Sequence, residues 1–255
     1  MKNNKKYIAV VFLLLGLMFP FFSNAQTKTS NNDVWFHYVG KNMLTKKLSF
    51  TLEATMRYAN GLSEKQQYFI RPSVDYQFTK KFMGSVGYSH YNTYVYGSPS
   101  LNKIDIPEDH VWIQGTFVHS KGKFKFTHRL RDENRFVGIA VKNGTTYAID
   151  HYDYRNRLRY MFLMNYTLTK KEDKVKLFGI FGDEAFFNIG ANTGKTFFNQ
   201  NRVIGGLGYN IDSHNQIQLN YIHQNIWNFS NTLQESNPTI RLSYITNLDF
   251  SKKQK

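Results

Sequence analysis

The chain has 255 residues, a net charge of +15 and no cysteine. The lack of cysteine excludes both a disulfide framework and a lipid attached to an N-terminal cysteine. A charge of this size suits nucleic acid, anionic lipid headgroups or charges enclosed inside a fold. Aromatic residues make up 16% of the chain, which is a high proportion.

The first 25 residues have the layout of a secretory signal peptide. Three lysines within the first six residues are followed by an apolar run, and the small residue Ala25 closes the segment. Residues 1–25 are therefore predicted to be cleaved, and residues 26–255 to form one domain. The alternative is a retained signal anchor, although the apolar run is short for a membrane helix and contains a proline.

Export changes how the positive charge is interpreted. Removal of Lys2, Lys5 and Lys6 lowers the net charge from +15 to +12. An exported protein rarely meets nucleic acid, so nucleic acid is not an expected partner. Outer-membrane lipid headgroups, or charges inside a barrel, account better for the excess. No residue pattern indicates a cofactor or a metal site, and neither is expected.

Beyond the leader, the mature chain alternates apolar and polar residues in segments separated by turns. This period of two indicates β-strands rather than helices. The clearest segments are 47–58, 67–78, 123–136, 154–168, 198–211, 215–225 and 239–250.

The segment HRLRDENRF, residues 128–136, shows the alternation most sharply. Leu130 and Phe136 share one parity. The other parity carries four charged residues: Arg129, Arg131, Glu133 and Arg135. That density exceeds what a solvated sheet needs, so this face is predicted to point into the water-filled interior of a barrel.

The connections between segments alternate in length. Short ones are predicted at 79–81, 120–123, 169–174 and 212–215, and long ones at 96–109, 137–150, 190–197 and 229–237. Short turns at one end and long loops at the other are typical of an outer-membrane barrel. The alternative is a soluble sandwich, in which the apolar faces would form the core and the charged faces would meet water.

The expected fold is thus an all-β, transmembrane, antiparallel up-and-down β-barrel of 10–12 strands. Ten long strands and a short leading segment, 33–40, are recognisable. Even counts are the rule in bacterial single-chain barrels, so ten or twelve strands are expected. A further strand parallel to the last one is expected to prevent closure. Phe250, at the end of the last segment, resembles the aromatic signal read by the barrel assembly machinery.

Six segments follow one another along the chain: NDVWFHYVGKNMLTKKLSFTLEATMRY, HRLRDENRF, RNRLRY, FGDEAFFNIG, FNQNRVIGGLGY and IQLNYIHQN. Taken in this order, they resemble one family of Gram-negative outer-membrane barrels, the domain-of-unknown-function family 2490. The resemblance spans nearly the whole mature chain. It implies a barrel in the outer membrane, but it carries no catalytic residue.

The candidate functional residues form a charge network on the lumen parity. The first interpretation is a plug of ion pairs in a narrow barrel with a structural or permeability role, because arginine binds carboxylate through two parallel hydrogen bonds. The second is an anion-selective pore or small-solute channel with an anionic solute as partner, since more arginines than acids share this parity. The network comprises Arg129, Arg131, Glu133, Arg135, Arg155, Arg157, Arg159, Glu184, Arg202 and Arg241.

A third interpretation is an outer-membrane lipid hydrolase. His223 with Ser230, or His151 beside Asp153, could contribute to a nucleophilic site. No spacing requires such a site, and the GxSxG motif is absent. The chain is therefore expected not to be an enzyme.

Overall fold

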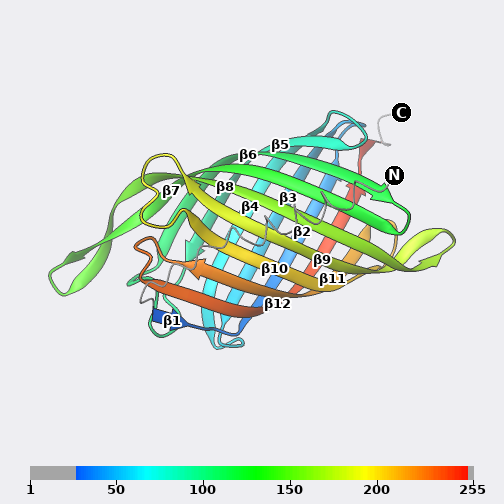
Figure 1. The fold of residues 1–255 in the computed structure, drawn as a ribbon. Helices are drawn as coiled ribbons and strands as arrows, with labels where there is room; N and C mark the ends of the chain where they lie inside the picture. Colours follow the sequence, from blue (N-terminus) through cyan, green and yellow to red (C-terminus); the bar gives the residue numbers. More distant parts are fainter. Residues whose placement is uncertain (1–26, 252–255) are drawn as a thin grey trace, which may run out of the picture.

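The structure, a computed structural model, describes residues 27–251 and forms a closed β-barrel (Figure 1). The predicted signal peptide lies outside the described residues. No helix within 27–251 is both long and apolar enough to cross a membrane. The predicted all-β barrel is confirmed.

Eleven strands make up the wall, and each is hydrogen-bonded to its neighbours in chain order. A short additional strand, β1 (Thr27–Thr29), precedes them. The eleven are β2 (Asp33–Met43), β3 (Leu48–Ala59), β4 (Glu64–Gln77), β5 (Phe82–Thr93), β6 (Ile106–Lys121), β7 (Phe124–Asn143), β8 (Thr146–Lys171), β9 (Lys174–Ile189), β10 (Phe198–Asn210), β11 (Asn215–Trp227) and β12 (Leu233–Asp249).

The barrel closes through a parallel pairing of its first and last long strands. β2 pairs with β12 from Asp33 opposite Thr239 to Met43 opposite Asp249. β1 also pairs with β12 in parallel, with Thr27 opposite Leu233. The expectation that a strand parallel to the last one would prevent closure is therefore wrong. An odd number of strands leaves the first and last running the same way, and a parallel ladder joins them.

Engineered disulfides can test this seam, because the chain has no cysteine of its own. We expect Val34→Cys with Ile240→Cys to cross-link in nearly all molecules, since these positions face each other across the seam. The shifted pair, Val34→Cys with Leu242→Cys, serves as the control. It lies about 8 Å apart between Cα atoms and should remain reduced. Gel mobility after mild oxidation measures both, and equal cross-linking of the two pairs would contradict this register.

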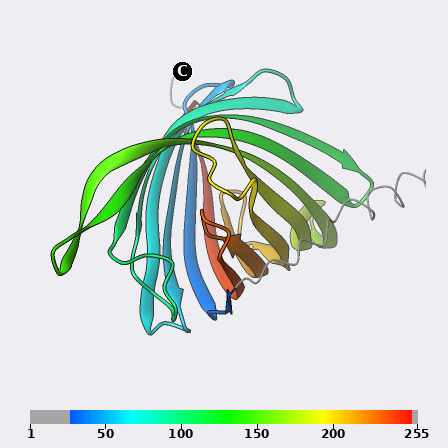
Figure 2. The same ribbon diagram turned by 60° about the vertical axis from the view of Figure 1, so that its left-hand side comes forward.

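The connections at the two ends of the barrel differ in length, as predicted, but one differs in kind. Residues 137–150 do not form a loop, because β7 and β8 continue as a hairpin that projects beyond the neighbouring strands (Figure 2). The hairpin turns at Gly144 and Thr145, where Gly144 has a φ of 60°. Glycine at the first turn position suits a two-residue hairpin turn. The other predicted loops lie at 94–105, 190–197 and 228–232. The first and last of these are shorter than predicted, because β6 begins at Ile106 and β12 at Leu233.

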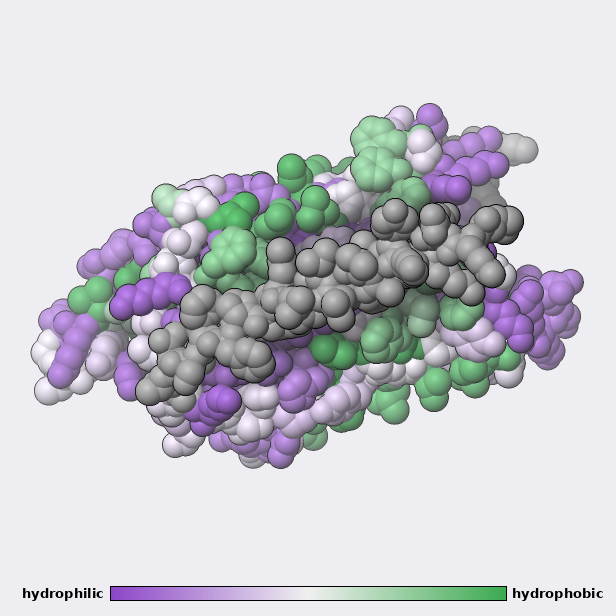
Figure 3. Space-filling view, viewed as in Figure 1, coloured by the Kyte–Doolittle hydropathy of each residue, from purple (hydrophilic) through white to green (hydrophobic). Residues whose placement is uncertain are grey.

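Large hydrophobic side chains are mainly on the outside of this barrel. Among the described residues, 43 large hydrophobic side chains are exposed and only 14 hydrophobic residues are buried. One row that runs across five neighbouring strands shows the pattern. Each residue of the row is opposite the next one in the sheet register, and all are exposed: Leu207, Leu219, Leu242, Phe36 and Met56. Figure 3 shows hydrophobic side chains over the middle of one face and hydrophilic ones at its projecting ends. This distribution is the reverse of a soluble sandwich.

The interior is not wholly polar, which the alternation did not predict. An apolar cluster of Trp35, Phe178, Ile180, Ile204 and Ile222 fills part of it. Two glycines of β10 make room for this packing. A Cβ at Gly208 would lie 2.2 Å from the Phe178 ring, and one at Gly206 would lie 2.4 Å from Asn220. Each of these contacts joins β10 to a residue directly opposite on an adjacent strand, so the two glycines leave room for the lumen-facing side chains of β9 and β11.

Candidate functional site: the arginine network of the lumen

The charged parity of β7 points into the barrel. Arg131 is 3% exposed and Glu133 is fully buried, whereas the intervening Leu130, on the outer face, is 50% exposed. Because successive side chains of a strand alternate between faces, this strand places all four of its charged lumen residues on one side. The charged face of β7 therefore lines the interior of the barrel.

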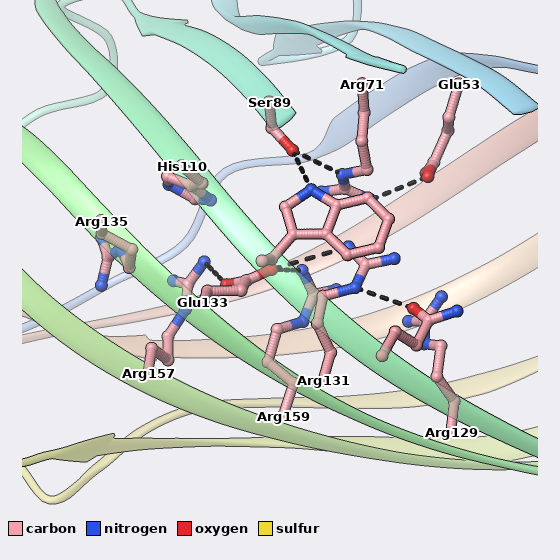
Figure 4. A network of polar contacts seen from close by, with 12 residues as sticks. Glu53, Arg71, Ser89, His110, Arg129, Arg131, Glu133, Arg135, Arg157 and Arg159 are labelled. Atoms are coloured by element: carbon pink, nitrogen blue, oxygen red, sulfur yellow. Dashed lines mark hydrogen bonds and ion pairs between the residues drawn. The ribbon is translucent and has the colours of Figure 1, made fainter. Parts of the chain in front are cut away.

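Glu133 accepts hydrogen bonds from two arginines of the adjacent strand β8. Arg157 donates through Nε at 2.9 Å and Nη2 at 2.7 Å, and Arg159 donates through Nη1 at 2.6 Å (Figure 4). A third, Arg131, lies 3.6 Å away. Glu133 is directly opposite Arg157 in the sheet register, so strand pairing itself brings these groups together. The carboxylate is fully buried and neutralised by guanidinium groups.

Glu184, on β9, is the second shared carboxylate. It lies 2.5 Å from Arg129, 2.7 Å from Arg159 and 3.4 Å from Arg202. Arg159 therefore bridges the two acids. Five guanidinium groups share the carboxylates of Glu133 and Glu184, which leaves this part of the network with an excess of positive charge.

A third acid, Glu108, belongs to the network although it falls within the loop predicted at residues 96–109. β6 begins at Ile106, so Glu108 lies in the strand and faces the lumen. It contacts Arg135 and lies 2.5 Å from the buried His110. The sequence pattern that could have identified Glu108 as a lumen residue is the alternation that continues from Glu108 through His110 and Trp112.

On the opposite wall, Glu53 pairs with Arg71 at 2.8 Å and with His37 at 3.1 Å. Arg71 also donates through Nε to Ser89 Oγ at 3.0 Å, and that oxygen accepts from the Trp112 indole at 2.9 Å. Arginine, acid and indole are thereby held in fixed positions (Figure 4).

Two lumen arginines have no carboxylate partner among residues 27–251. Arg57 donates to Gln67 Oε1 at 2.6 Å, and Arg241 donates to Asn220 Oδ1 at 3.1 Å. The other eight lie within 4.0 Å of a carboxylate, including Arg155, which is 3.4 Å from Asp153 at the loop end. These eight are Arg71, Arg129, Arg131, Arg135, Arg155, Arg157, Arg159 and Arg202.

Aromatic rings of the lumen pack against several of the arginine side chains. The Cζ atoms of Arg57 and Arg202 lie 4.1 Å and 5.0 Å from the Trp35 ring centroid, so two cations meet one indole. Arg131 lies 4.1 Å from the Trp112 ring in the same way. Cation–π contact with an indole stabilises a desolvated guanidinium without neutralising its charge.

The lumen contains two cavities, of about 420 Å³ and about 280 Å³. Four residues line both of them and so lie between them: His37, Glu53, Arg71 and Arg129. The larger cavity is lined by eight arginines and three glutamates, an excess of five positive charges before any bound ion is considered.

The β5–β6 loop, residues 94–105, lies at the mouth of the larger cavity and contributes Tyr96 and Leu101 to its lining. The Tyr96 hydroxyl donates to Glu235 Oε2 at 2.9 Å, and the Gly97 amide donates to Glu64 Oε2 at 2.8 Å. Burial and the neighbouring Glu235 raise the pKa of Tyr96 well above its ordinary value. The phenol therefore stays protonated and remains a donor that holds the loop in place.

The family comparison matches residues 32–235 to the model described as "Protein of unknown function (DUF2490)". The match covers most of the chain, including the strands that carry Glu133 and Glu184. The chain belongs to the DUF2490 family.

Two further comparisons concern this DUF2490 protein. No curated protein gives a significant match. A solved structure described as "NanC porin structure in rhombohedral crystal form" aligns at 10% identity with a TM-score of 0.40. That alignment covers 79% of this chain and 93% of the other. At this level of similarity, the site of the DUF2490 protein has to be interpreted from its own residues.

The histidine and serine residues considered for a lipid hydrolase are arranged differently from the prediction. His223 Nε2 lies 3.1 Å from Ser236 Oγ, whereas the Ser230 hydroxyl contacts Thr232. His151 lies on the projecting hairpin, where both of its ring nitrogens face carboxylates of nearby aspartates. Within the described part of this DUF2490 chain, no acid forms a hydrogen bond with His223, so the contact lacks the third, orienting group of a triad.

Groups of three or more potential metal ligands do not occur among residues 27–251. His119 and His128, which flank the β6–β7 turn, stack on each other with ring centroids 5.6 Å apart.

Proposed function

We propose that this protein is an integral outer-membrane β-barrel whose lumen is filled by the arginine network, with a structural or permeability role. One observation carries the proposal: the same closed wall presents hydrophobic side chains outward and buried guanidinium–carboxylate pairs inward. Hydrocarbon suits the outer face, and ion pairs stabilise the buried carboxylates of the inner face. The predicted signal peptide and Phe250 agree with export and with recognition by the barrel assembly machinery. Outer-membrane lipid is then the surrounding partner.

The interior contacts support a filled rather than an open lumen. Arg71 and Glu53 lie between the two cavities and are held by hydrogen bonds. The apolar cluster around Trp35 and Phe178 occupies further space. A solute crossing the barrel would have to displace these groups.

The proposal predicts that the protein fractionates with the outer membrane and that the refolded barrel is silent in a planar lipid bilayer. Membrane fractionation and single-channel recording measure these two properties. Recovery from the detergent-free periplasmic fraction would refute the membrane location. Frequent, large openings would refute the filled lumen while leaving the location intact.

The second candidate function is an anion-selective pore. It is favoured by the shared acids, because five guanidinium groups lie around only Glu133 and Glu184. Rings of arginine favour anions in pores. Small, discrete openings with a reversal potential that reports anion selectivity would support this candidate over a fully closed barrel.

A further inference from the structure

We infer that the larger cavity contains a binding site for one small organic oxyanion, a carboxylate or a phosphate, between Arg57, Arg241 and the Trp35 indole. The inference rests on the proposed function in one respect. The closed wall separates these charges from bulk solvent, where an exposed arginine finds counter-ions freely.

The sheet register places the three residues side by side. On the lumen face, Trp35 of β2 is opposite Arg241 of β12 on one side and Arg57 of β3 on the other. Neighbouring strands are about 4.8 Å apart, so the two arginines flank the indole. All three residues line the cavity of about 420 Å³.

The two flanking arginines are the ones that the network leaves without an acid. Their hydrogen-bond partners are the neutral amides of Gln67 and Asn220, and the Nε atom of each arginine is buried without an acceptor. Asp33 lies near Arg57 in the fold, but it accepts a hydrogen bond from Gln66 instead and lies more than 4.0 Å from any arginine nitrogen. An arginine cannot lose its proton, so its charge needs compensation from elsewhere.

Further unused donors surround this row. Asn220 Nδ2 and the Thr55 hydroxyl are both buried without a partner. Arg202, over the same Trp35 ring, shares its carboxylate Glu184 at 3.4 Å with two other arginines. Arg57 Nε, Arg241 Nε and Asn220 Nδ2 are buried donors without an acceptor, against the buried acceptor Asp33 Oδ1, so unpaired donors outnumber it. An unpaired buried group points to a missing ion or ligand. An oxyanion supplies both the acceptors and the charge.

The chemistry and size of the cavity restrict the ligand. Guanidinium groups bind carboxylate and phosphate through paired hydrogen bonds. The Trp35 ring offers a flat apolar surface to the rest of the molecule. A volume of about 420 Å³ suits a small organic anion and excludes a polymer. Entry would pass Tyr96 and Leu101 of the β5–β6 loop.

Calorimetric titration and thermal unfolding of the detergent-refolded, full mature chain test the site. The probes are benzoate, acetate and inorganic phosphate, with chloride as the reference at constant ionic strength. The matched control is Arg155→Gln, which removes the same charge from the same parity but lies outside the cavity lining and has its own acid, Asp153.

We expect one bound equivalent of benzoate or phosphate in the wild type and in Arg155→Gln. Arg57→Gln and Arg241→Gln should each bind about tenfold more weakly, as expected for the loss of one charge-assisted contact. Both variants should also unfold at a higher temperature than the wild type in chloride alone, because an uncompensated buried charge has been removed. A purely structural role for these arginines predicts the opposite shift.

Equal weakening in Arg155→Gln would overturn the site, since it would show a general effect of lumen charge. The absence of saturable oxyanion binding in the wild type would also overturn it. If Arg57→Gln fails to refold, Arg241→Gln carries the same test. Fractionation reports the membrane location separately, so a misplaced barrel and an absent site give different results. The preference between benzoate and phosphate identifies the acidic group of the ligand.

Discussion

Replacing Glu133 with glutamine should lower the free energy of unfolding by about 3–5 kcal/mol. Glu133 is fully buried and is the carboxylate shared by Arg131, Arg157 and Arg159. Glutamine keeps the size of the side chain but removes its charge. Three guanidinium groups then lose their shared carboxylate, and only Arg159 keeps another one within 4.0 Å, Glu184. Urea unfolding of the refolded barrel, followed by heat-modifiable gel mobility, measures the change.

The control for this substitution is Glu172→Gln, which removes the same charge from the exposed β8–β9 turn. Its effect should stay within about 0.5 kcal/mol. An equally small effect of Glu133→Gln would mean that water or bound anions, rather than Glu133, compensate these arginines.

Replacing Leu219 with arginine should destabilise the barrel in lipid by about 2–4 kcal/mol. Leu219 is 57% exposed on the outer face, between Leu207 and Leu242 in the apolar row. In water, such a substitution on an exposed strand would be nearly neutral. In a bilayer, the guanidinium would meet hydrocarbon. Folding equilibria in lipid vesicles measure the difference.

Tyr147→Arg serves as the control, because Tyr147 is also exposed but lies on the projecting β7–β8 hairpin, beyond the neighbouring strands. That variant should fold as the wild type does. If Leu219→Arg were equally harmless in vesicles, the outer face would not contact hydrocarbon and the membrane proposal would fail.

Local alternation was enough to predict which side of the wall the charged residues of β7 occupy. Arg131 and Glu133 are buried and Leu130 is exposed, because a strand alternates its faces regardless of its neighbours. The same reasoning suggested the pairing of Glu133 with arginines. It could not identify which arginines share an acid, since that depends on the register between β7 and β8.

Features that depend on distant parts of the chain were not predictable in this way. The parallel seam joins Asp33 to Thr239, and no local pattern records that pairing. Glu108 was missed as a lumen residue because Pro107 and its neighbours resemble a turn, whereas the strand already begins at Ile106. The hairpin of residues 137–150 was interpreted as a loop although Asn143 and Gly144 indicate a tight turn between two strands.

The parallel seam also determines at which end of the barrel each end of the described chain lies. Because β2 and β12 run the same way, Thr27 lies at the end of the long loops and Phe250 at the end of the short turns (Figure 1). A barrel with an even number of strands has both termini at one end. In a bilayer, this wall would therefore display an epitope placed before Thr27 on one surface of the membrane, and one placed after Phe250 on the opposite surface.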